Sequence, residues 1–142
     1  MLDADPMIIL YPFDAAYCYD ALSILDVKVR SGRATEHQIA AVLETYSRAD
    51  AILRGQVGFE RHYRIKQSEE YDRLVFLNQR LFDEFDWLHT RGVTAPAEEV
   101  KMRAIETDRI NGVERPAAKR ALQERWFRTV PTEVKIGYGG DK

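Results

Sequence analysis

Residues 68–92, SEEYDRLVFLNQRLFDEFDWLHTRG, carry the strongest helical signal in the chain. The apolar side chains of this stretch recur at steps of three and four residues over about five turns, which predicts an amphipathic helix with one buried face. That face comprises Tyr71, Leu74, Val75, Asn78, Leu81, Phe82, Phe85 and Leu88. Ser68 supplies an N-cap hydroxyl and Gly92 a stop. A long helix of this kind needs similar partners to cover it, so we expect an all-α fold.

Helical signals continue on both sides of this stretch. Capping residues, apolar periodicity and Gly or Pro stops predict further helices over residues 14–30, 35–54, 96–111 and 116–130. The second of these begins with the capping box Thr35-Glu36-His37-Gln38, and an apolar stripe follows it from Ile39 to Leu53. We expect Asp14 to cap the first helix and Asn111-Gly112 to end the fourth.

The remaining segments carry weaker signals. Residues 58–67 mix four bases with two aromatics and are expected to form a loop or a ragged helical turn. Alternation over residues 132–138 predicts a short strand or an extended arm. Five helices with short connections predict one antiparallel bundle, a single domain over residues 1–142 with an ordered core at about 8–136.

Composition limits the class of protein. The chain has 142 residues, 45% of them hydrophobic and 11% aromatic, which is globular rather than disordered composition. A single cysteine, Cys18, excludes a disulfide scaffold and is expected to be a reduced, packed thiol. A net charge of -2 argues against general nucleic-acid binding. Without a signal peptide or a run of about 18 apolar residues, we expect a cytoplasmic protein with no membrane association.

The charge is unevenly distributed along the chain. Residues 1–28 carry five acids and one base, whereas residues 101–142 carry ten bases and six acids. These two regions could simply meet in the fold. They could also form a local anion site or guide self-association, and a homo-oligomer is expected because one small domain gains surface that way.

No metal or cofactor is expected. Glu69-Glu70-Tyr71-Asp72 and Asp83-Glu84-Phe85-Asp86 only partly match the paired carboxylate motifs of helical Mg²⁺-dependent nucleotide phosphohydrolases, and a solvated acidic face explains them better. The three histidines, His37, His62 and His89, have no metal-ligand spacing. The chain also lacks a glycine-rich phosphate loop.

Two polar features remain as candidates for binding. Arg115 and Lys119 are four residues apart and share a helix face, a pair that can hold a phosphate or carboxylate, although an exposed solvated face is the simpler interpretation. Asn78 lies on the buried stripe, where it either fixes the register of the helices or faces a polar cavity.

Several short motifs resemble a family of small, uncharacterised, all-helical bacterial proteins that occur in gene regions for surface polysaccharides. The resemblance rests on Asp20-Ala21-Leu22-Ser23-Ile24-Leu25-Asp26-Val27-Lys28, on Asn78 to Asp83, and on Asn111 to Arg115 with Lys119 and Arg120. The interval from Asn111 to Arg115 is one residue longer than the family pattern. The resemblance implies a helical fold and selects polar positions, but it implies no reaction.

We therefore expect a non-enzymatic binding protein for a small anionic ligand of the nucleotide or nucleotide-sugar type. The candidate site is a polar pocket between helices formed by Asp20, Lys28, Asn78, Arg115 and Lys119. The same groups could instead form a salt-bridged network that stabilises the bundle. Two other functions stay open: an oligomeric assembly module without a ligand, and a Mg²⁺-dependent nucleotide phosphohydrolase.

Overall fold

The computed structural model describes residues 15–31 and 35–127, and these residues form helices without any strand. The elements are α1 (Ala15–Arg30), α2 (Glu36–Val57), α3 (Phe59–Lys66), α4 (Glu69–Arg91), α5 (Ala97–Arg109), the π-helix η2 (Ile110–Glu114) and α6 (Arg115–Trp126). The all-α expectation is confirmed. The expected Asp14 cap, the tail at 132–138 and the outer parts of the expected core lie outside the described residues.

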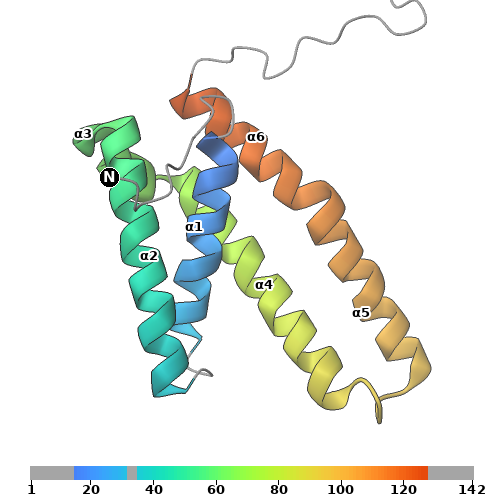
Figure 1. The fold of residues 1–142 in the computed structure, drawn as a ribbon. Helices are drawn as coiled ribbons and strands as arrows, with labels where there is room; N and C mark the ends of the chain where they lie inside the picture. The colour runs from blue at the N-terminus through green and yellow to red at the C-terminus, as the bar shows by residue number, and fades with distance from the viewer. Residues whose placement is uncertain (1–14, 32–34, 128–142) are drawn as a thin grey trace, which may run out of the picture.

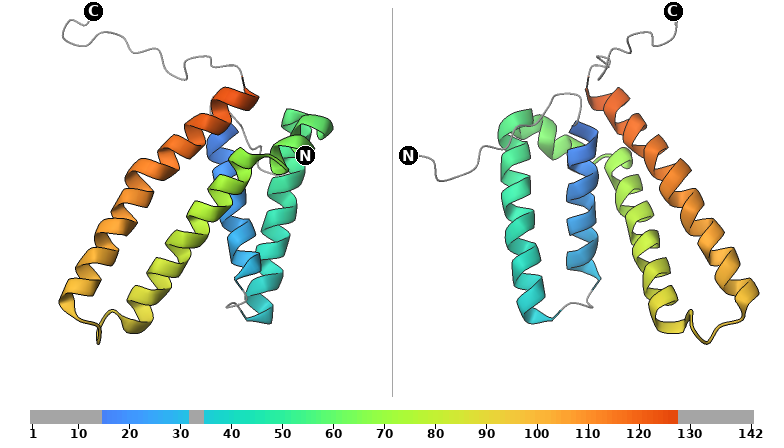
Figure 2. Two further views of the ribbon diagram at one scale, coloured as in Figure 1. Left: turned by 180° about the vertical axis from the view of Figure 1, so that it is seen from behind. Right: turned by 45° about the vertical axis from the view of Figure 1, so that its right-hand side comes forward.

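The helices form two antiparallel hairpins that share one packed end (Figure 1). The first hairpin is α1 with α2, and the second is α4 with the long helix α5–η2–α6. Helix α1 packs against α2, α4 and α6, whereas α3 links the hairpins at the packed end. Toward the α4–α5 turn the two hairpins diverge, as Figure 2 shows from two further sides.

Two predicted helix starts are confirmed in atomic detail. The Thr35 hydroxyl accepts from the Gln38 backbone N–H, and the Gln38 side chain accepts from the Thr35 backbone N–H. The Ser68 hydroxyl likewise accepts from the backbone N–H of Tyr71 at 3.2 Å. These side chains satisfy backbone donors that have no partner within the helix, which is why the helices begin at these residues.

The expected loop at residues 58–67 is wrong for most of its length, because Phe59–Lys66 forms helix α3. Gly58 ends α2 with a φ of 102°, a conformation that glycine adopts readily, and the chain re-enters a helix at once. His62 and Ile65, three residues apart, are the side chains that α3 buries. Their burial stabilises a segment whose sequence is too polar to predict a helix.

The expected break at Asn111-Gly112 is also wrong. The chain continues through the π-helix η2, so the two helices predicted over 96–111 and 116–130 form one continuous helix as far as Trp126. Ile110, the first residue of η2, and Leu122, beyond it in α6, are both fully buried. Packing on both sides thus keeps the chain helical, and the wider π turn accommodates one more residue than an α turn.

The core lies at the packed end. Its largest fully buried side chains come from α1, α3, α4, η2 and α6: Tyr19, Leu22, Ile65, Tyr71, Leu74, Leu77, Ile110 and Leu122. Cys18 is half-buried and packs against this core, whereas the apolar stripe predicted for α2 buries only Leu53. Among the described helices, none combines the length and apolar character needed to cross a membrane.

Candidate functional site

Helices α1, α4 and α6 bring together a buried polar cluster around Asp20. The Asn78 amide Nδ2 donates to Asp20 Oδ1 at 3.0 Å and to the Ser23 hydroxyl at 2.8 Å. Ser23 in turn donates to the backbone carbonyl of Asp20 at 2.7 Å. All three residues are buried, so these hydrogen bonds replace those that water would make.

Arg115 completes this cluster from the first turn of α6. Its Nη2 donates to Asp20 Oδ2 at 2.6 Å, and its Nη1 donates to the Asn111 side chain in η2 at 2.7 Å. The guanidinium Nε is buried and has no hydrogen-bond partner among the described residues. An unpaired buried donor costs about 1–3 kcal/mol, and π turns often occur at functional sites. The unpaired Nε and the π-helix η2 occur together at the Arg115 end of the cluster.

The structure therefore unites three of the five predicted site residues, Asp20, Asn78 and Arg115, and not the other two. Lys28 is exposed about two turns further along α1, and Lys119 is half-buried one turn beyond Arg115. Within residues 15–31 and 35–127, neither ammonium group has a hydrogen-bond acceptor. The direct bond from Arg115 to Asp20 occupies the guanidinium that a ligand would need, so the arrangement favours a structural network.

A second polar network was missed from the sequence. The Tyr19 hydroxyl lies 2.7 Å from His62 Nδ1, and His62 Nε2 lies 2.7 Å from Asp50 Oδ1. Lys66 donates to the same Asp50 oxygen at 2.9 Å and also to the Tyr46 hydroxyl. The sequence feature that could have indicated this network is Asp50. It follows Tyr46 by four residues and therefore shares the apolar face of α2, where a carboxylate needs polar partners.

Charge and burial determine the ionisation of this network. Burial alone would raise the pKa of Asp50, but hydrogen bonds from Lys66 and His62 outweigh it and lower the pKa. Burial, reinforced by the nearby Asp50, raises the pKa of Tyr19 well above its ordinary value. Tyr19 is fully buried in the core. The network links α1, α2 and α3.

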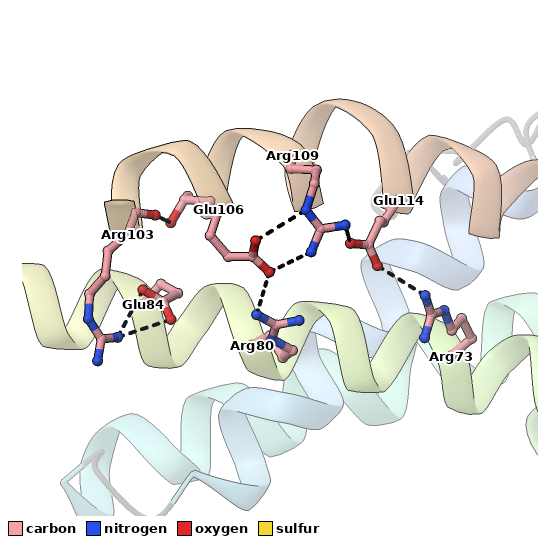
Figure 3. A network of polar contacts seen from close by, with 8 residues as sticks. Arg73, Arg80, Glu84, Arg103, Glu106, Arg109 and Glu114 are labelled. Carbon is pink, nitrogen blue, oxygen red and sulfur yellow. Dashed lines mark hydrogen bonds and ion pairs between the residues drawn. The ribbon is translucent and has the colours of Figure 1, made fainter. Parts of the chain in front are cut away.

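Ion pairs connect α4 to the long helix that follows it (Figure 3). Arg80 bonds Glu106 at 2.7 Å, Arg73 bonds Glu114 at 3.0 Å, and Arg109 contacts both of these glutamates. Nearer the turn, Arg103 bonds Glu84 at 3.1 Å and lies over the Trp87 ring at 4.1 Å. Each of these partly exposed pairs contributes little by itself, but together they define how the two helices face each other.

The part of this hairpin beyond the core, residues 82–106, is called the distal hairpin below. It contains no buried residue. Phe85 follows Leu81 by four residues and Asn78 by seven, so it continues the face of α4 that is buried higher up. Phe85 is nevertheless 55% exposed. Phe85 is thus an exposed aromatic side chain on the extension of a buried face.

Two further findings bear on function. Within the described residues, no group of three or more His, Cys, Asp or Glu side chains is arranged to hold a metal ion. No protein-family model, curated protein or solved structure matches the chain. The family resemblance of the short motifs thus stays a prediction.

Proposed function

We propose that this protein is an assembly module that associates with further copies of itself through one apolar face of the distal hairpin. That face consists of Phe85 and Leu88 on α4 with Val100 and Ala104 on α5. Phe85 carries the proposal, because it extends the buried stripe of α4 and remains 55% exposed. The sequence expectation of a cytoplasmic protein is kept as part of this proposal.

Helical spacing supports the composition of this face. Leu88 follows Leu81 by seven residues on α4, and Val100 precedes the buried Thr107 by seven on α5. Residues seven apart lie on the same side of a helix, so each extends a face that is buried at the packed end. Full burial of one such side chain contributes about 1.5–3 kcal/mol, and a second copy can supply the cover.

The ion pairs prepare this surface for association. Arg103 on α5 is bonded to Glu84 on α4 and lies over the Trp87 ring. These contacts fix the orientation of α5 relative to α4 within a single copy, without a partner. A surface that is ordered in advance loses less conformational entropy on binding. The distal hairpin therefore presents its apolar face in a fixed geometry.

Sedimentation velocity over a concentration series of the full chain tests this function. We expect concentration-dependent association that Phe85→Ser weakens by about tenfold or more, because burial of the ring is lost. The matched control is Met102→Ser. Met102 is 64% exposed but lies two residues from both Val100 and Ala104, on the opposite side of α5. A wild-type monomer at every concentration, or equal effects of the two changes, would contradict the proposal.

A second function, binding of a small anion of the nucleotide or nucleotide-sugar type, would depend on Lys119, which is half-buried one turn beyond Arg115 on α6. Lys119 gives the clean test, because its ammonium group has no acceptor in the described part of the chain. A thermal-shift screen with nucleotides and nucleotide sugars should then show a stabilising ligand whose effect Lys119→Ala removes. A screen without any shift would reject this second function and leave the assembly proposal untouched.

A further inference from the structure

We propose that Pro116 and one surplus residue in η2 form a conformational device, which carries a proline through the long helix without rotating one half of that helix relative to the other. Pro116 is the second residue of α6 and follows η2 directly, so it lies inside the continuous helix of residues 97–126 (Figure 1). This inference concerns the fold of the chain, and it stands whether or not the association proposed above occurs.

The spacing along the long helix shows that η2 holds one residue more than an α-helix would. One face of the helix is marked by steps of three, four and three residues before η2, and by the same steps after it. Its members are Val100, Arg103, Thr107 and Ile110, and then Arg115, Ala118, Leu122 and Arg125. Alternating steps of three and four follow one side of an α-helix. The step across η2, from Ile110 to Arg115, is five where this pattern requires four.

The contacts of these side chains confirm that the two halves present the same face. Four of them are buried: Thr107, Ile110, Ala118 and Leu122. Arg103 before η2 bonds Glu84 on α4 at 3.1 Å, and Arg125 after η2 bonds Glu70 on α4 at 2.9 Å. Each residue turns an α-helix by about 100°, so in an unbroken α-helix the surplus residue would rotate α6 away from this face by that angle. The π turn takes up the surplus and keeps the halves aligned.

Pro116 gives the physical reason why the surplus lies at this place. Proline has no backbone N–H, and inside an α-helix its ring clashes with the carbonyl group four residues earlier. For Pro116 that carbonyl belongs to Gly112, the middle residue of η2. In η2 the backbone N–H of Arg115 bonds the carbonyl of Ile110, five residues earlier. The turn is therefore wider than an α turn at the point where the proline ring needs room.

Gly112 is the residue whose deletion removes the surplus with little other change. It is exposed, and a side chain at its position would meet no atom within 4 Å. Without it, the step from Ile110 to Arg115 becomes four, which is the α-helical spacing. The deletion thus keeps both halves in register but places Pro116 inside a regular α-helix.

Thermal unfolding of four full-length proteins, followed by circular dichroism, tests the device. Deletion of Gly112 alone should lower the melting temperature by about 10 °C, because Pro116 then clashes with the preceding turn. Pro116→Ala alone should melt close to the wild type, since η2 remains. The combined variant should melt at least as high as the wild type, because its helix is then α-helical throughout and in register.

The matched control is deletion of Ala121, which is also exposed on the same helix. This deletion moves the fully buried Leu122 off its face, so it should lower the melting temperature by about 10 °C with or without Pro116→Ala. The inference is overturned if the Gly112 deletion alone melts like the wild type, or if Pro116→Ala fails to rescue it. If the Gly112 deletion alone does not fold, the combined variant still decides between these outcomes.

Discussion

Between Tyr71 and Leu81, helix α4 buries five side chains, whereas between Phe82 and Arg91 it buries none. The apolar spacing is the same in both parts. The two parts of α4 differ in which helices pack against them. Helices α1 and α6 cover the first part, whereas the two hairpins diverge along the second part (Figure 2). Helical periodicity thus produces a face that can be buried, and only a neighbouring element decides whether it is.

The two regions also differ in how their helices are held. At the packed end, apolar burial and the Asp20 cluster act together, whereas the distal hairpin depends on partly exposed ion pairs such as Arg103–Glu84. Burial stabilises far more than exposed pairs do. The distal hairpin is therefore the less stable region and the one with surface available for a partner.

The largest expected effect comes from truncating the same residue type in each region. Leu74→Ala removes a fully buried side chain and should lower the free energy of unfolding by about 3 kcal/mol. Leu88→Ala on the same helix should cost less than about 1 kcal/mol, because Leu88 is only half-buried. Urea unfolding at a concentration where the protein is monomeric measures both, and equal losses would refute the comparison.

Next in size is the Asp20 cluster. Arg115→Ala leaves the buried Asp20 carboxylate without its charged partner and should cost about 3 kcal/mol. Adding Asp20→Asn removes that unpaired charge, so the double variant should be more stable than the sum of the single losses predicts. Arg109→Ala, which removes an exposed arginine of the distal pairs, is the control and should cost much less than Arg115→Ala. A double-mutant cycle with additive losses would mean that Arg115 and Asp20 do not interact energetically.

A smaller effect concerns pH. Because Asp50 has a lowered pKa in the folded state, its contribution to stability is present above the unfolded-state value of 3.8 and is lost as the pH falls through the folded-state pKa. Asp50→Asn should therefore melt below the wild type at pH 7, with the difference shrinking below about pH 4. Glu106→Gln removes a carboxyl that Arg109 and Arg80 also stabilise, but at an exposed site. The melting temperature of Glu106→Gln should therefore differ from that of the wild type by less than the melting temperature of Asp50→Asn does. A larger difference for Glu106→Gln would contradict the stronger contribution assigned to Asp50.

The smallest expected effect is that of salt on the distal ion pairs. Arg80→Ala should lower the free energy of unfolding by less than about 1 kcal/mol at low ionic strength. Raising the salt concentration to about 1 M should remove most of that difference, since exposed pairs are screened over about 3 Å at that ionic strength. A loss that persists in high salt would show that Arg80 contributes through packing of its alkyl chain.

Much of the candidate site was predictable from residue types alone. Asn78 on an apolar stripe requires polar partners when it is buried, and the structure supplies Asp20 and Ser23, with Arg115 bonded in turn to Asp20. Lys28 and Lys119 were predicted with them, but spacing along one helix does not determine which side chain reaches across to another. The Tyr19–His62–Asp50 contacts were missed for the same reason, because they join α1, α2 and α3.

The helical class and the starts of α2 and α4 follow from local spacing, because periodicity and capping depend on residues three or four apart. The other features of the fold depend on tertiary contacts. Burial of His62 and Ile65 made α3 a helix, and burial on both sides of Asn111 carried the chain through η2. Phe85 is exposed although the apolar pattern of the sequence predicts that its face of α4 is buried, because no described helix packs against it. Each of these outcomes depends on which element lies opposite, and local spacing along the chain carries no information about that.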